Sequence, residues 1–143
     1  KTPKALQAMP LATLEKIIRS SGFYKNKAKA IKNICNALID RFRGKVPKTR
    51  EELLSIKGIG IKTANLVLAE AYGIPALVVD THVHRLSNMF GLVHTKTAEQ
   101  TEKELQKVVP EKDWIKFSRL MITWGQHNLG KKAILKELKV TGL

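Results

Sequence analysis

The chain has 143 residues, and 43% of them are hydrophobic, which suits one domain with a packed core and excludes a disordered basic tail. Its 26 Lys and Arg residues against 12 Asp and Glu give a net charge of +14, which favours a polyanionic partner such as nucleic acid. No apolar run approaches the length of a membrane-spanning helix, so we expect no membrane association.

The one cysteine, Cys35, cannot form an intramolecular disulfide, so it predicts an intracellular protein. Its apolar neighbours at helical spacing predict a buried, inert thiol.

Two helices are predicted in the first third of the chain. The first starts at Pro10, shows an apolar stripe at helical spacing and stops at Gly22. The second is capped by Asn26 and ends at Gly44. Its first half is loaded with positive charge by four lysines, namely Lys25, Lys27, Lys29 and Lys32. Because this placement opposes the helix dipole, the lysines either serve a ligand or form a solvated face.

The segment from about 50 to 73 predicts two helices joined by a glycine turn. Thr49 and Glu52 form the Thr-x-x-Glu pattern of a capping box, and we expect the first helix to direct both of its leucines inward. The second helix starts near Lys62 and is apolar on nearly all sides, so we expect it to be buried on most of them.

The turn between these helices has the features of an anion site. Two glycines one residue apart leave no Cβ to block a close approach. The N–H groups of the turn and of the next helix start lack intrahelical partners and carry the positive end of the helix dipole. In a chain of this charge the expected anion is a nucleic-acid phosphate. The residues predicted to grip the phosphate backbone are Lys57, Gly58, Ile59, Gly60, Ile61 and Thr63.

The second half of the chain predicts further helices. The apolar run at 76–79 could be a buried strand, but no partner strand is visible, so we interpret it as an extended connector. Asp80 directly precedes the next helical pattern, where a carboxylate can cap free N–H groups. Three helices follow, at about 81–90, 97–109 and 111–128. The fold class is therefore all-α.

Lys62 and Asp80 are the candidates for chemistry. Desolvation, nearby positive charge and a helix N-terminus each disfavour the ammonium form of Lys62, and a neutral amine can form a Schiff base with a sugar carbon. Asp80 could face a cleft and stabilise positive charge on a sugar ring. The plainer alternatives are phosphate binding for Lys62 and helix capping for Asp80. Whether the chain between them folds back to bring the two together is not visible in the sequence.

The segments that carry a family resemblance are KGIGIKTAN and VVDTHVHRLSN. They resemble the endonuclease III family of DNA glycosylases in the helix-hairpin-helix superfamily. Three further segments are also similar to that family, namely SGFYKNKAKAI, GKVPKTREELLSIKGIG and FSRLMITWGQHN. The resemblance implies two helical subdomains with a cleft between them. Residues 1–75 would be part of the helical barrel subdomain, with the hairpin at about 50–73, and residues 76–143 the second subdomain.

The resemblance also implies an activity. Such a protein is a base excision repair DNA glycosylase with abasic-site lyase activity, acting on oxidised pyrimidines in duplex DNA. The lysine matching Lys62 attacks C1′ of a flipped-out nucleotide, and the aspartate matching Asp80 assists base loss and the following proton transfers. A lysine at that position indicates combined base removal and β-elimination. The implied partner is double-stranded DNA with a damaged base or an abasic site, in the nucleoid or the nucleus.

Three departures from the family pattern qualify this reading. Family members usually have proline where Lys57 stands, and a lysine there adds a phosphate contact. The helices that the family has before this point are not in these residues, so the chain is a fragment, a partner supplies them, or the protein differs there. A monomer is expected unless a partner does supply them.

The third departure concerns cofactors. No four cysteines follow the GQH segment, so we expect no iron–sulfur cluster. The tail is basic instead, with Lys131, Lys132, Lys136 and Lys139. The four histidines have no spacing that suggests a metal site. A monovalent cation on the hairpin's backbone carbonyls is implied by the resemblance alone.

Two alternative functions remain open. One is a non-catalytic helix-hairpin-helix DNA-binding module, which the missing N-terminal helices favour. The other is a glycosylase for alkylated or mispaired bases.

Overall fold

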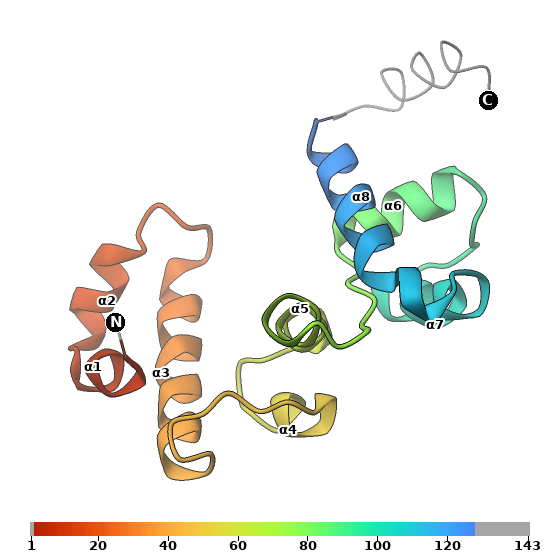
Figure 1. The fold of residues 1–143 in the computed structure, drawn as a ribbon. Coiled ribbons are helices and arrows are strands. Elements are labelled where there is room, and N and C mark those ends of the chain that lie inside the picture. The colour runs from red at the N-terminus through yellow and green to blue at the C-terminus, as the bar shows by residue number, and fades with distance from the viewer. Residues whose placement is uncertain (1, 128–143) are drawn as a thin grey trace. The chain divides into compact units, whose positions relative to one another are not determined.

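A computed structural model of the protein describes residues 2–127, which are helical and contain no β-strand (Figure 1). The predicted all-α fold class is confirmed. Two compact units divide the chain, Lys1–Ala64 and Asn65–Leu143, hereafter unit 1 and unit 2. The predicted subdomain boundary near residue 75 stays a prediction, and the predicted basic tail lies outside the described residues. No helix in the described part is long and apolar enough to cross a bilayer.

Unit 1 is built on helix α3 (Tyr24–Asp40), against which α1 (Pro3–Ala8) and α2 (Leu11–Ile17) pack (Figure 1). The buried face of α3 includes Cys35, as predicted. Burial raises the pKa of its thiol, and Lys32 acts in the opposite direction with a smaller effect. A thiol with a raised pKa holds less of the reactive thiolate, which suits a core residue.

Helix α1 was missed by the sequence pattern. The Thr2 hydroxyl accepts a 3.3 Å hydrogen bond from the Ala5 N–H and caps the start of this helix. At the other end, the Lys32 ammonium donates to the carbonyls of Gln7 (2.5 Å) and Met9. A cation at a helix C-terminus meets the carbonyls that have no intrahelical partner. One of the four lysines assigned to a ligand or a solvated face is therefore structural.

Two predicted helix ends near residue 22 are wrong. α2 ends at Ile17, because the residues after it bond at i−3 spacing, with the Ser21 N–H on the Ile18 carbonyl at 2.9 Å. α3 starts after Phe23, whose carbonyl accepts from the Lys27 N–H at 3.0 Å, so Asn26 lies inside the helix and does not cap it. Phe23 itself is left-handed, with φ 57°, and its residue surface is 83% exposed.

The hairpin segment is formed by α4 (Arg50–Leu54) and α5 (Ile61–Tyr72). The expectation that both α4 leucines face inward is wrong for Leu54, which is 38% exposed, while Leu53 is buried. α5 is also less enclosed than its composition predicts. Leu66 is exposed, because the buried side of the helix is taken by Ala64, Asn65, Leu68 and Ala69.

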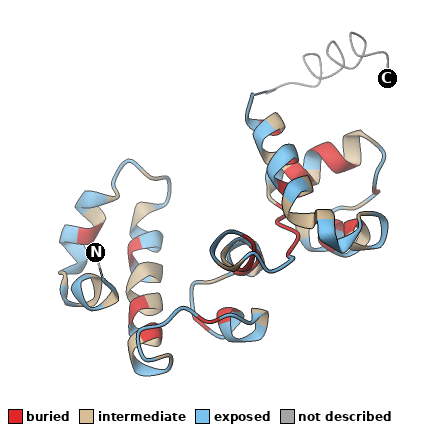
Figure 2. Cartoon of the chain, in the orientation of Figure 1, coloured by how far each residue is buried: buried red, intermediate tan, exposed pale blue. Residues whose placement is uncertain are grey.

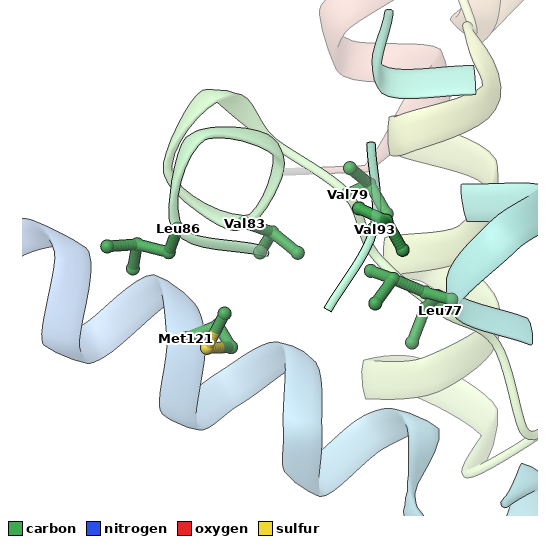
Figure 3. Packing of buried hydrophobic residues seen from close by; sticks show 7 residues of the cluster. Leu77, Val79, Val83, Leu86, Val93 and Met121 are labelled. Atoms are coloured by element: carbon green, nitrogen blue, oxygen red, sulfur yellow. The ribbon is translucent and has the colours of Figure 1, made fainter. Parts of the chain in front are cut away.

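Over its described residues, 65–127, unit 2 contains most of α5 and three further helices with a 3-10 turn before the last. These are α6 (Thr81–Met89), α7 (Ala98–Val108), η1 (Glu111–Asp113) and α8 (Trp114–His127). The buried apolar core draws on the connector, on all three helices and on the loop after α6 (Figure 3). Its members are Leu77, Val79, Val83, Leu86, Val93, Leu105 and Met121.

The run at 76–79 is the predicted extended connector, and all four residues are buried (Figure 2). Without a partner strand its backbone groups need other partners. The Val78 N–H donates to the Ser118 hydroxyl of α8 at 2.9 Å. The Leu77 carbonyl accepts from the Asn65 amide of α5 at 2.8 Å. Hydrogen bonds with side chains of two helices thus take the place of those with a partner strand, and they fix the segment that leads to Asp80.

Candidate active site

The first half of the hairpin is fixed by caps at both ends of α4. The Thr49 hydroxyl oxygen accepts from the Glu52 N–H at 3.3 Å, which confirms the predicted cap. The box is incomplete, because the Glu52 carboxylate accepts from the Thr49 hydroxyl at 3.0 Å and not from the backbone. At the other end, Arg41, which directly follows α3, donates to the Ser55 carbonyl (3.2 Å) and hydroxyl (2.8 Å). The hairpin is therefore tied to α3.

The two glycines of the turn have different surroundings. Gly58 has φ 106°, and a Cβ there would lie 2.9 Å from the Cβ of Ala30 on α3, closer than side chains tolerate. Gly60 has no heavy atom within 4 Å of the position that its Cβ would take. Gly58 thus lets the turn pack on α3, whereas the space beside Gly60 is open to a ligand.

The start of α5 is an exposed cluster of polar and basic residues. Lys57, Lys62 and Thr63 are exposed. The Gly60 carbonyl accepts from the Ala64 N–H at 2.9 Å, which is the first hydrogen bond of the helix. A glycine at this position has no side chain with which to cap the first turn. The residues predicted to bind phosphate therefore lie in the hairpin turn and the first turn of α5, at a helix N-terminus where a phosphate is favoured.

Asp80 caps α6. One of its carboxylate oxygens, Oδ1, accepts from the N–H groups of His82 and Val83, both at 2.9 Å. The capping role considered for this residue is confirmed, and it also holds the half-buried carboxylate in one orientation. Lys62 belongs to unit 1 and Asp80 to unit 2, so their meeting across a cleft stays a prediction.

Phe23 is a surface feature that the sequence reading did not single out. Its exposed ring is placed by a left-handed backbone that most residues avoid, and Lys25 and Lys27 follow it. The available signal was a bulky residue directly after Gly22 in a basic segment.

Within residues 2–127, no three His, Cys, Asp or Glu side chains group as ligands for a metal ion. The hairpin carbonyl of Ile56 accepts from the Ile59 N–H in the turn, and that of Gly60 accepts from the Ala64 N–H of α5, while each oxygen has a second lone pair. A monovalent cation there stays a prediction.

Comparison with known proteins gives consistent matches. Residues 1–111 match the family of HhH-GPD superfamily base excision DNA repair proteins. Endonuclease III of Thermotoga maritima is 43% identical over 126 residues, which are 88% of this chain and 59% of the relative. The chain thus spans about three fifths of the length of this relative and of Endonuclease III of Bacillus subtilis.

Two solved structures are also similar. A non-covalent Endonuclease III–DNA complex matches with a TM-score of 0.86 at 41% identity, over 92% of this chain and 62% of that one. A trapped Endonuclease III–DNA covalent intermediate matches with a TM-score of 0.85 at 42% identity, over 90% of this chain and 61% of that one.

Proposed function

Because the chain belongs to the HhH-GPD superfamily of base excision DNA repair proteins, we propose that it is a DNA glycosylase with abasic-site lyase activity. Together with the identity to Endonuclease III over most of the chain, this membership confirms the resemblance seen in KGIGIKTAN and VVDTHVHRLSN. The observation that carries the proposal is Lys62, exposed in the first turn of α5, in a chain 42% identical to a protein trapped covalently on DNA. The proposed substrate is duplex DNA with an oxidised pyrimidine, in the nucleoid or the nucleus.

Lys62 is the proposed nucleophile. Its neutral amine forms a bond to C1′ of the damaged nucleotide while the bond from C1′ to the base breaks, and the base leaves with a proton. Opening of the sugar ring gives a Schiff base. Loss of a C2′ proton then expels the 3′ phosphate and nicks the strand.

Asp80 is the proposed helper. Base loss builds positive charge on the sugar, and a fixed carboxylate stabilises that charge because it needs no reorganisation. The cap supports this role, because two backbone N–H groups hold Oδ1 in place. The nucleotide must leave the duplex stack to reach either residue.

The hairpin turn is the proposed grip on the DNA backbone. The open space beside Gly60 admits a phosphate to the N–H groups at the α5 start, and Lys57 and Thr63 add polar reach. Such contacts carry no sequence information, which suits a protein that must act at any sequence. The exposed Phe23 ring is a proposed stacking surface for a base.

No iron–sulfur cluster is proposed for these 143 residues, because a single cysteine cannot supply four thiolates. A monovalent cation on the hairpin carbonyls would add a positive charge near a bound phosphate. A colourless protein preparation without stoichiometric iron is the expected observation.

The test is borohydride trapping on duplexes with an abasic site. We expect a covalent protein–DNA adduct, because reduction fixes a Schiff base. Duplex binding without any adduct would support the rival reading of a non-catalytic binding module. An adduct without release of oxidised pyrimidines would support a glycosylase for alkylated or mispaired bases. Duplexes that contain alkylated or mispaired bases would then test that activity.

A further inference from the structure

Gly125 of α8 packs against His82 of α6 at very close range. A Cβ on Gly125 would lie 2.6 Å from the Cβ of His82, and 2.9 Å from its Cγ and its Nδ1. Gly125 is buried and sits inside a helix, where glycine costs about 0.5–1 kcal/mol relative to alanine. A glycine at such a position calls for a packing reason, and His82 supplies it.

The histidine is tied to the candidate catalytic carboxylate. The backbone N–H of His82 is one of the two donors that hold Oδ1 of Asp80, and the N–H of Val83 is the other. The first turn of α6 therefore sets the position of the carboxylate. A displacement of the His82 backbone would therefore change one of the hydrogen bonds that hold the Asp80 carboxylate.

The same turn is held from α8 at a second point. Val83 and Leu86 of α6 face Met121 of α8 in the buried core (Figure 3). Met121 and Gly125 are four residues apart and so share one face of α8. That face fixes α6 through an apolar contact at Met121 and through close backbone approach at Gly125.

We propose that Gly125 is a positioning residue for Asp80, acting through His82, which rests on the function proposed above. Rotation of the His82 side chain about its Cα–Cβ bond could move Cγ and Nδ1 away, but it cannot move Cβ, because that atom is bonded directly to the backbone. A methyl group at position 125 must therefore shift the first turn of α6 relative to α8. Misplacement by about 1 Å can reduce a rate by about 10²-fold.

The test is Gly125→Ala, assayed on two substrates. Base release from a damaged duplex should slow at least about tenfold, because that step needs the carboxylate in place. Adduct formation on a preformed abasic site should stay within about threefold of wild type, because the base is already gone. Thr123→Ala is the control on the same helix, at an exposed position, and should change neither rate.

A double-mutant cycle makes the assignment specific. In the His82→Gly background the contacted Cβ is absent, so Gly125→Ala should slow base release by less than about twofold further. Equal loss of both activities in Gly125→Ala, with a lower melting temperature, would mean a merely structural glycine and would overturn the proposal. So would an undiminished rate of base release.

Two measurements separate the coupling of Gly125 to Asp80 from the proposed function. Gly125→Ala should shift the amide resonances of His82 and Val83, whose N–H groups make the cap. If the wild-type protein releases no base, the proposed function is overturned, while unshifted resonances would overturn the coupling of Gly125 to Asp80.

Discussion

The two helices that carry the candidate catalytic residues start in opposite ways. α5 follows Gly60, which has no side chain to cap it, whereas α6 follows Asp80, whose carboxylate accepts two N–H bonds of 2.9 Å. The start of α5 thus keeps its partial positive charge available to an outside anion, and the start of α6 is neutralised from within. The two helix starts are therefore suited to different tasks, the α5 start to phosphate binding and the α6 start to placement of a carboxylate.

The two units also differ in net charge, and the unit with the start of α5 is the more positive one. Unit 1 holds 15 Lys and Arg against 4 Asp and Glu, a net +11, while unit 2 holds 11 against 8, a net +3. Unit 2 instead holds the connector and the core that fix Asp80. We therefore expect unit 1 to supply most of the salt-dependent affinity for DNA.

The largest expected effect is that of Lys62→Gln. It should abolish the borohydride-trapped adduct and strand nicking, because glutamine has no amine to form a Schiff base. Lys62 is exposed, so the fold and most of the duplex affinity should remain. Gel detection of the adduct and a binding isotherm check this on one preparation. A wild-type rate of trapping would place the nucleophile at another residue.

Asp80→Asn should act on a different step. Asparagine is as good a helix cap as aspartate, so the melting temperature should change little. Base release should slow by about 10²-fold, because the charge that stabilises the sugar cation is gone. Trapping on a preformed abasic site should persist in part. Unfolding of the variant would show that capping is the main role of this residue.

The hairpin glycines allow a matched pair of substitutions. Gly58→Ala should destabilise unit 1 by about 1–3 kcal/mol, because it forces an alanine to positive φ and into contact with Ala30. Gly60→Leu should leave the melting temperature nearly unchanged and weaken binding to all duplexes alike, because it fills the proposed phosphate space. Thermal unfolding and binding titrations at several salt concentrations separate the two. Equal affinity of Gly60→Leu and wild type would contradict the phosphate grip.

The last comparison concerns two buried serines of unit 2, and the smaller effect is expected at Ser87. Ser118 accepts from the Val78 N–H, so Ser118→Ala leaves a buried amide unpaired and should destabilise by about 1–3 kcal/mol. The Ser87 hydroxyl has no hydrogen-bond partner among the residues that the structure describes, so Ser87→Ala should be neutral or stabilise by up to about 1 kcal/mol. Chemical denaturation measures both. A clear loss of stability in Ser87→Ala would reveal a partner for that hydroxyl.

Local chemistry was enough to predict much of this protein. Thr49 and Asp80 cap the helices that follow them, and the run at 76–79 is an extended connector, because capping and chain breaking depend on a few adjacent residues. The family could be predicted for the same reason, since its motifs lie in short contiguous segments.

Only the tertiary structure decided the features that depend on residues far apart in the sequence. α1 is a short helix held by Lys32, which lies 25 residues beyond the Gln7 carbonyl it bonds. Gly58 and Gly60 look alike in the sequence, but only Gly58 has a positive φ and lies against Ala30. Gly125 meets His82 from another helix. Such pairings depend on which surfaces the fold brings together, and no pattern of neighbouring residues encodes them.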